Sequence, residues 1–502
     1  MRVALAASLA AAVALYLWMS YRKEPAYLNQ YDDAYITFRY AANWARGKGL
    51  VFNVGERTDA ASSFLYTAVL AFAYKIGLTD LERVSFLLGV GSAGGICGVI
   101  ASFAKTRTRS WIAPACIGLC AGLHGFIAGW AVSGMETTLY ALLAAAVVVR
   151  ILSGKPGGAV TGALLAAALL TRFEAGILII GWGILAATRF RRADRAERKD
   201  LLLVLLLVAV AGVGLLTFRK LYYGTVIPQP FALKHLLLGY QPQPRAMVAQ
   251  WQARALTYVL LGVAGLVQLW RSRAEAAPAM TVIMALAVGS VLNGPSSDWG
   301  RYSTYVLPLF VLCFVDLATA CWDRLPAVFA VLAVLVGLEA SDSFTWMKDA
   351  DNSIAPHQIC RKQVGRYLAA HVTTDAPVIS ADIGAIAYVA RDARFLDVVG
   401  LTSGSVLHAL QAGTNLDAIL LDRRPAYVAD TLIRAGAGYR YHAIDYIEAR
   451  GITTRTPPRS LVAPHLKWGV PLDSCGPEGG QFRFGVSTVS YDDATPAPSA
   501  HP

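Results

Sequence analysis

The chain has 502 residues, of which 56% are hydrophobic and only 16% are charged, and its mean hydropathy is +0.47. A typical soluble domain carries roughly 25% charged residues, so the composition excludes an ordinary water-soluble protein and indicates a membrane protein. The net charge of +12 could suggest nucleic acid, but many basic residues lie in short clusters between apolar runs. Anionic lipid headgroups require that placement, so we expect membrane lipids as partners and no nucleic acid.

Apolar stretches follow one another from residue 3 to about residue 340, and several are shorter than the roughly 20 residues that cross a bilayer. We therefore expect a polytopic bundle of about 11 transmembrane helices over residues 1–343, with some stretches tilted, broken or re-entrant. The first is expected to be an uncleaved helix, because no A-x-A-like cleavage site follows it. The stretches are Val3–Trp18, Ala61–Gly77, Val84–Ala104, Trp111–Trp130, Leu139–Leu152, Ala159–Leu170, Ala175–Ala187, Leu201–Phe218, Ala255–Trp270, Thr281–Leu292, Tyr305–Ala320 and Pro326–Leu338.

Basic clusters at Arg189–Lys199, Lys105–Arg109 and Arg271–Arg273 predict the cytoplasmic loops. Counting spans outward from them predicts that residues 222–250, 293–301 and everything after about residue 341 are periplasmic. A first periplasmic loop is expected at residues 21–60, although this leaves one apolar stretch too many before Lys105. The chain is thus predicted to be a multi-pass protein of a bacterial inner membrane.

Polar residues return after Ser341, and residues 344–491 are predicted to form a periplasmic mixed α/β domain, followed by a disordered tail at 492–502. Cys360 and Cys475 are the two cysteines of this domain, which makes them a disulfide candidate in an oxidising compartment. The expected strands are Pro377–Ser380, Phe395–Val399 and Phe482–Val489, and the expected helices are Pro356–Ala370 and Val406–Gln411.

Two adjacent carboxylates, Asp32 and Asp33, open an interfacial helix that is predicted for Ala34–Arg46. Helical periodicity places Asp32, Tyr35 and Arg39 along one side, with Asp33 about 100° away. Acidic residues also favour the first turn of any helix through capping and the macrodipole. The pair alone therefore does not distinguish a helix cap from a catalytic base, which could take a proton from an acceptor hydroxyl at the membrane boundary.

The strings Asp32–Ala41 and Gly49–Arg57 resemble the first periplasmic loop of bacterial GT-C glycosyltransferases similar to the mycobacterial terminal arabinofuranosyltransferases. Further strings support the resemblance in the same order and extend it over most of the chain. They are Ser133–Leu139, Thr171–Glu174, Tyr222–Lys234, Asp382–Tyr388 and Asp397–Leu401.

The resemblance implies a GT-C helix bundle and an inverting transfer of a sugar, arabinofuranose by the nearest likeness, from a polyprenyl-phosphate donor. The acceptor is expected to be a periplasmic hydroxyl on a glycan, a lipid or a protein. One of the Asp pair would be the base, with Asp33 preferred to Asp32. No cofactor is required; adjacent carboxylates can hold a divalent cation, but a metal is not favoured and no metal ligand is assigned.

The donor phosphate should meet cations, and the candidates are Arg39, Lys234, His235, Arg301 and Arg172. Snorkelling of basic side chains to lipid headgroups is the alternative explanation for each. Glu136 and Glu174 lie beside apolar helices and need partners, for which Arg172 and Arg301 are available. Supporting roles are expected for Tyr35, Glu136, Glu174 and Asp298.

Three loop carboxylates have two explanations each. Asp298, beside Trp299, suits sugar stacking or an aromatic interfacial belt, and Asp382 and Asp397 suit carbohydrate binding or turn chemistry. For the whole chain, a multi-span lipid or solute transporter or flippase is the alternative function. A scaffold protein is the third. Inverted halves are not visible, and a paired Asp in the first loop is hard to explain as a transport feature.

Overall fold

The computed structural model describes residues 30–236, 248–249, 254–292, 300–372, 377–413, 416–435, 438–441, 443, 466–468, 473–475 and 482–491. The predicted first helix Val3–Trp18, Asp298 and the predicted disordered tail lie outside these residues. For Lys234 and His235 the backbone is described and the side chains are not.

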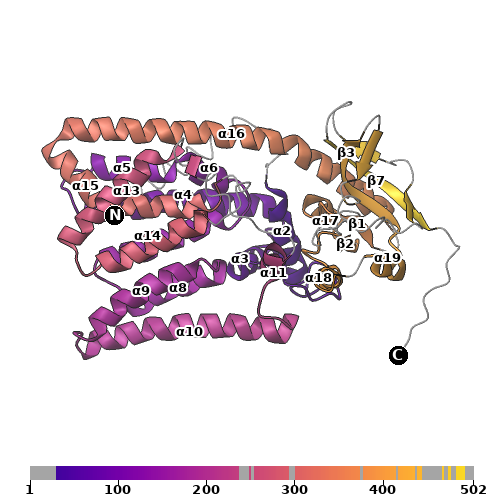
Figure 1. Ribbon diagram of the computed structural model, residues 1–502, viewed down its shortest axis with the longest axis horizontal. Helices are drawn as coiled ribbons and strands as arrows, with labels where there is room; N and C mark the ends of the chain where they lie inside the picture. Colours follow the sequence, from indigo (N-terminus) through magenta and orange to yellow (C-terminus); the bar gives the residue numbers. More distant parts are fainter. Residues whose placement is uncertain are drawn as a thin grey trace.

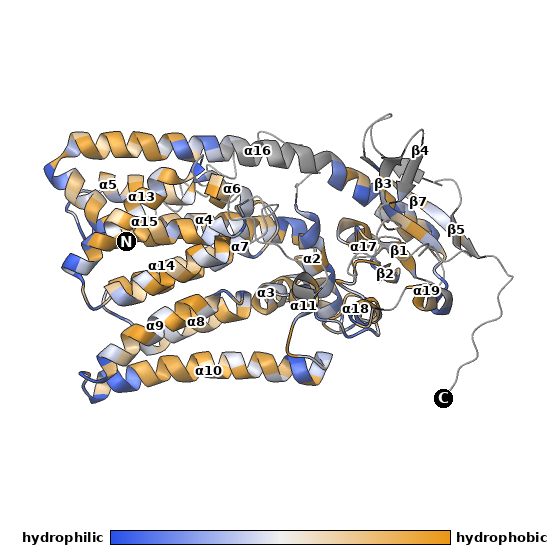
Figure 2. Cartoon of the chain, in the orientation of Figure 1, coloured by the Kyte–Doolittle hydropathy of each residue, from blue (hydrophilic) through white to orange (hydrophobic). Residues whose placement is uncertain are grey.

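Every apolar stretch within the described residues forms helix, and the helices lie side by side as a bundle (Figure 1). Hydrophobic residues predominate along these helices (Figure 2), and large apolar side chains such as Leu205, Val210 and Leu260 are exposed, as a lipid environment requires. The helices are α3 (Phe64–Lys75), α4 (Leu81–Lys105), α5 (Ile112–Gly122), α6 (Gly125–Ala131), α7 (Thr137–Leu152), α8 (Gly158–Thr171), α9 (Ala175–Phe190), α10 (Arg195–Tyr223), α13 (Leu256–Ser272), α14 (Ala277–Leu292), α15 (Ser303–Arg324) and α16 (Pro326–His371).

Four helices within the described residues are long and apolar enough to cross a membrane: α4, α10, α15 and residues Pro326–Ser343 of α16. The pair α5 and α6 counts as a fifth if it is one span, bent by 60°. The expectation that some stretches are broken is thus confirmed for Trp111–Trp130. The backbone freed at this break is satisfied, because Ser343 Oγ accepts a hydrogen bond from the Gly125 N–H at 2.9 Å.

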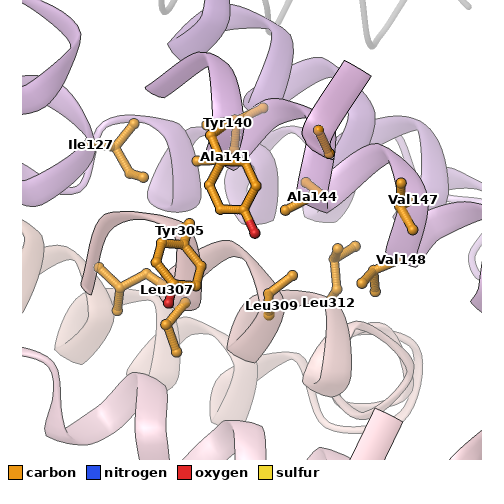
Figure 3. Close-up of a cluster of buried hydrophobic side chains, with 14 of the residues drawn as sticks. Ile127, Tyr140, Ala141, Ala144, Val147, Val148, Tyr305, Leu307, Leu309 and Leu312 are labelled. Atoms are coloured by element: carbon orange, nitrogen blue, oxygen red, sulfur yellow. The ribbon is translucent and has the colours of Figure 1, made fainter. Parts of the chain in front are cut away.

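The bundle core forms where α7 packs against α15, with Tyr140 and Tyr305 edge to face at 5.2 Å between ring centroids (Figure 3). Small side chains allow other helices to approach closely. A Cβ atom added at Gly265 of α13 would lie 2.3 Å from the Cys313 carbonyl oxygen of α15. Glycine is therefore required at this crossing.

The C-terminal domain is built on a mixed sheet (Figure 1). Seven strands lie within the described residues, with β2-β1-β3-β7-β5 as the main order, β4 beside β3 and β6 beside β7. The β1 strand pairs in parallel with β2 and β3, whereas β3 and β7 are antiparallel. The strands are β1 (Val378–Ser380), β2 (Phe395–Asp397), β3 (Tyr427–Ala435), β4 (Gly438–Tyr441), β5 (Leu466–Trp468), β6 (Asp473–Cys475) and β7 (Phe482–Tyr491).

The predicted strands are confirmed in β1, β2 and β7. The β2 strand ends at Asp397, two residues earlier than expected, because the Asp397 carboxylate accepts hydrogen bonds from the N–H groups of Val399 and Thr402 at 2.8 and 2.7 Å. Those N–H groups are then not available for hydrogen bonds to a neighbouring strand. Short helices complete the domain: α17 (Ala385–Val389), α18 (Gly404–Gln411), which confirms the helix expected at Val406–Gln411, and α19 (Asp417–Arg423).

The helix α16 joins the two parts of the molecule. It continues for 46 residues from the bundle into the C-terminal domain, through the predicted boundary at residue 343 (Figure 1). The helix predicted at Pro356–Ala370 is its last section. Near its end, Cys360 and Cys475 form the disulfide that the sequence suggested, with Cα atoms 5.2 Å apart.

Two further helices lie where the bundle meets the sheet domain, α2 (Asp32–Ala45) and α11 (Gln229–Leu236) (Figure 1). The helix predicted at Ala34–Arg46 is thus confirmed as α2, starting two residues earlier. Its first residues are the two aspartates, so α2 carries the predicted catalytic pair to the junction of the two parts.

Candidate active site

One side of α2 packs against α17 of the C-terminal domain, and it is the side that periodicity predicted. Asp32, Tyr35 and Arg39 all contact residues in or beside α17. The Tyr35 ring lies 5.7 Å from that of Tyr388, between centroids. The predicted alignment of the three residues is confirmed, and it serves contact between the two parts of the molecule.

Asp32 is held by backbone donors of the C-terminal domain. Its carboxylate accepts hydrogen bonds from the N–H groups of Gly384 at 3.0 Å and Ala385 at 2.9 Å. A Cβ atom at Gly384 would lie 2.4 Å from the Asp32 carboxyl carbon, so this approach requires glycine. Burial raises the pKa of Asp32, although the Arg361 guanidinium 3.6 Å away acts in the opposite direction.

Arg39 contacts main-chain carbonyl groups, and its predicted contact with the donor phosphate stays a prediction. Its side chain is buried, and its nitrogens donate to the carbonyls of Phe52 at 2.8 Å, Ala393 at 2.7 Å, Ala390 at 3.3 Å and Ala387. Burial lowers the pKa of Arg39 to about 9. All three nitrogens are committed to main-chain carbonyls, so Arg39 fixes the C-terminal domain to α2.

Asp33 is arranged differently from its neighbour. The side chain is exposed, and it makes no hydrogen bond or ion pair to any residue that the structure describes. Asp33 therefore keeps both carboxylate oxygens available at the junction of the bundle and the C-terminal domain. The turn of about 100° between successive helix residues separates the two aspartates.

A second group of charges lies in the loops of the bundle, and we call Glu136, Arg172, Glu174 and Arg301 the bundle cluster. Arg172 contacts Glu136 at 2.6 Å and Glu174 at 2.7 Å, and Arg301 contacts Glu136 at 3.1 Å. The partners predicted for both glutamates are confirmed. Burial would raise the pKa values of Glu136 and Glu174, but the arginines outweigh it and lower both.

The two arginines of the bundle cluster have different neighbours. Each of the three Arg172 nitrogens donates to a carboxylate, and contact between Arg172 and the donor phosphate stays a prediction. Arg301 contacts Glu136 through one nitrogen and lies over the Trp130 ring at 5.7 Å. Trp130 in turn stacks on Tyr31 at 4.7 Å, immediately before the Asp pair. Contact between Arg301 and the donor phosphate stays a prediction.

Lys234 and His235 lie in α11, and the start of that helix is tied to two neighbouring segments. The Gln229 N–H donates to the Asp59 carbonyl at 2.9 Å, and the Gln229 side-chain amide donates to the Gly400 carbonyl at 2.6 Å. Asp59 itself forms a buried ion pair with Arg219 at 2.8 Å. Burial raises the pKa of Asp59 to about 6 against the effect of Arg219. These contacts hold the start of α11 beside the first loop, and the phosphate-binding role of Lys234 and His235 stays a prediction.

Sequence reasoning missed a further group of charges beside Asp32, and we call Asp32, Arg361, Asp382 and Asp430 the domain cluster. Arg361 contacts Asp382 at 3.1 Å and Asp32 at 3.6 Å, and Asp430 accepts a hydrogen bond from the Asp382 N–H at 2.9 Å. The sequence suggested only carbohydrate binding or turn chemistry for Asp382, and no ion pair. The signal for Arg361 was its place directly after Cys360, one of the predicted disulfide pair.

The remaining candidate carboxylates fit structural roles. Asp397 is buried and accepts hydrogen bonds from its own turn, which supports turn chemistry over carbohydrate binding. Asp382 is engaged by Arg361 and by the Thr431 hydroxyl. Within the described residues, no group of three or more His, Cys, Asp or Glu is placed to hold a metal ion. Metal independence stays a prediction.

The apolar helices and the fold together define an integral membrane protein with a helix bundle and a small mixed α/β domain. Its fold is similar to that of ArnT from Cupriavidus metallidurans, whose crystal structure is bound to undecaprenyl phosphate. The TM-score is 0.51 and the identity 13%, covering 91% of this chain and 93% of that chain. Residues 352–463 match a family model described as a domain of unknown function (DUF8728). No curated protein matches the sequence.

Proposed function

We propose that the protein is an inverting glycosyltransferase that moves a sugar from a polyprenyl-phosphate donor to an acceptor hydroxyl. The observation that carries the proposal is the unequal Asp pair. Asp32 is fixed by two backbone N–H groups, and it holds in place the helix turn on which Asp33 stands exposed. A pair that only capped α2 would not need an exposed second carboxylate at the junction of the two parts.

In the proposed reaction, the Asp33 carboxylate accepts the proton of the acceptor hydroxyl. The hydroxyl oxygen attacks the anomeric carbon of the sugar from the face opposite the phosphate. The bond between the anomeric carbon and the phosphate oxygen breaks, and polyprenyl phosphate leaves with the electron pair. The acceptor is the partner that needs activation, because a phosphate is already a good leaving group.

The donor phosphate is proposed to lie between Arg301 and the residues Lys234 and His235 of α11. Arg301 is linked to the start of α2 through Trp130 and Tyr31, and α11 is tied to the first loop through Gln229. Support for the donor class comes from the shared fold with ArnT, whose structure holds undecaprenyl phosphate. The prenyl chain has no reason to leave the bilayer, since each buried CH₂ is worth roughly 0.8 kcal/mol.

The active site and the C-terminal domain are proposed to face the periplasm of a bacterial inner membrane. The Cys360–Cys475 disulfide supports this side, because disulfides persist in oxidising compartments. Arabinofuranose is proposed as the sugar, on a glycan, lipid or protein acceptor. Mass spectrometry of the lipid that co-purifies with the protein identifies the sugar independently of activity, and a lipid carrying another pentose or a hexose would overturn arabinofuranose.

The test of the reaction is Asp33→Asn, assayed in detergent with the identified donor. The amide keeps the size of the side chain but cannot take a proton, so we expect kcat to fall by about 10²- to 10⁴-fold with an unchanged unfolding temperature. Asp392→Asn is the matched control, because Asp392 is an exposed carboxylate paired with Lys48 at the surface. Transfer near the wild-type rate in Asp33→Asn would exclude Asp33 as the base.

A further inference from the structure

Three consecutive residues of α16 connect three separate parts of the molecule. Cys360 is bonded to Cys475 of the sheet, Arg361 reaches Asp32 of α2 and Asp382, and Lys362 pairs with Glu82 at the start of α4 at 2.6 Å. Successive residues of an α-helix are rotated by about 100° around the helix axis, so three successive side chains point in three directions. This section of α16 is therefore the meeting point of sheet, first loop and bundle.

Arg361 is the residue of the three that reaches the proposed active site. Its guanidinium contacts Asp382 at 3.1 Å and Asp32 at 3.6 Å, and it lies over the Phe484 ring at 4.8 Å. Phe484 is the residue of β7 that pairs with Cys475 of β6. The disulfide thus fixes the strand pair on which the guanidinium rests, one residue away from Arg361 in α16.

Arg361 is the cation that offsets the repulsion among the carboxylates around it. The domain cluster holds three carboxylates against this one guanidinium, and Asp33 adds a fourth carboxylate next to Asp32. Like charges at such distances repel unless a cation lies between them. Removing Arg361 would leave Asp32 and Asp382 facing each other, and the first turn of α2 would have to move.

We infer that Arg361 is a positioning residue for sugar transfer, and that the Cys360–Cys475 disulfide keeps it in place. The inference rests on the proposed function, because Asp33 must be the group that is positioned. Arg361 holds Asp32, Asp32 fixes the first turn of α2, and that turn aims Asp33 at the acceptor. We therefore expect Arg361 to affect the acceptor side of the reaction and to leave binding of the donor phosphate unchanged.

The first test compares Arg361→Gln with Arg361→Lys, and uses Arg366→Gln as the matched control, because Arg366 is exposed five residues further along α16. We expect Arg361→Gln to lower kcat about 10- to 100-fold, as a displacement of roughly 1 Å can do, with binding of undecaprenyl phosphate unchanged. Arg361→Lys keeps the charge without the planar fork and should recover part of the rate. Arg366→Gln should behave as wild type.

The pH profile separates positioning from a loss of fold. The titratable groups that face Asp32 are Arg361 of α16, Asp382 of the loop before α17, and Asp33 and Tyr35 of α2. Without the cation, the acid limb of kcat/KM should move to higher pH in Arg361→Gln and return toward the wild-type position in Arg361→Lys. Equal loss at every pH, or loss of undecaprenyl phosphate binding, would overturn the positioning role.

The second test asks whether the disulfide acts through Arg361. The double variant Cys360→Ser with Cys475→Ser should lower kcat by a similar factor, and adding Arg361→Gln should lower it little further. Multiplicative effects, or wild-type transfer without the disulfide, would show that the two are independent and overturn this part. If Asp33→Asn is fully active, the proposed function fails; if only the Arg361 variants are fully active, this inference alone fails.

Discussion

The bundle cluster and the domain cluster lie on either side of the start of α2, and their charges are balanced differently. The bundle cluster sets two arginines against two glutamates, and the pKa values of Glu136 and Glu174 are lowered as a result. The domain cluster sets one arginine against three aspartates, and burial together with the neighbouring carboxylates raises the pKa values of Asp32 and Asp430. Buried carboxylates thus have lowered pKa values in the bundle cluster and raised pKa values in the domain cluster.

The comparison shows that the cost of buried charge depends on how many opposite charges are present. In the bundle cluster each carboxylate is stabilised as an anion, which makes the cluster a rigid connection between α7, α8 and α15. In the domain cluster the excess negative charge is tolerated only because backbone N–H groups and Arg361 share it. The first arrangement favours stability, and the second leaves the cluster sensitive to a single residue.

The largest effect on stability is expected from Arg172→Ala. The change leaves Glu136 and Glu174 buried without their shared partner, which costs about 3–5 kcal/mol for a broken buried pair. Thermal unfolding in detergent measures the loss, with Arg46→Ala as the control, since its ion pair with Asp392 is exposed and worth about 0–1 kcal/mol. Equal losses in the two variants would contradict the balanced bundle cluster.

A smaller effect should distinguish the same chemical change in the two clusters. Glu174→Gln removes a charge from a balanced group and should lower stability by about 1–3 kcal/mol. Asp382→Asn removes an excess negative charge and keeps an oxygen for Arg361, so it should change stability by less than about 1 kcal/mol or increase it. The comparison is measured as the difference in unfolding temperature, and a larger loss in Asp382→Asn would reverse the assignment.

The smallest effect is the pH dependence. Glu136 and Glu174 have lowered pKa values, so their contribution to stability is complete above the ordinary value of 4.5 and is lost as the pH falls through their folded values. Asp32 and Asp430 have raised values, so their contribution is complete below 3.8 and is lost as the pH rises. Below about pH 5, unfolding temperatures should fall less on acidification in Glu174→Gln than in wild type. An unchanged slope would refute the bundle assignment.

Periodicity and composition predicted the helices well, because apolar helices and the side of α2 that packs depend on local spacing. They did not predict that Arg39 would serve packing. An arginine seven residues after Asp32 shares its side of the helix, where its spacing suits a phosphate or a packing contact. Only the position of α17 shows that main-chain carbonyls lie beside its guanidinium. The same spacing is compatible with both outcomes, because a sequence does not record what lies opposite.

The site was predicted in part for a similar reason. Glu136 and Glu174 required cations, and the sequence offered Arg172 and Arg301, so these pairs could be inferred from the cost of buried charge. The contact between Arg361 and Asp32 could not be inferred in this way. Arg361 lies more than 300 residues from Asp32, in a polar region where an arginine needs no explanation. Contacts between distant segments depend on the tertiary arrangement, and a single sequence contains no signal for them.

The unbroken course of α16 couples its two ends in rotation. Eighteen residues separate Ser343, which accepts the Gly125 N–H of α6, from Arg361, and at about 3.6 residues per turn this is about five turns. Both side chains therefore leave the helix in nearly the same direction, toward the bundle at one level and toward α2 at the other. A one-residue deletion between them would rotate the disulfide, Arg361 and Lys362 together by about 100° while leaving the membrane span in place. Helical phase, as much as distance, sets the geometry of the candidate site.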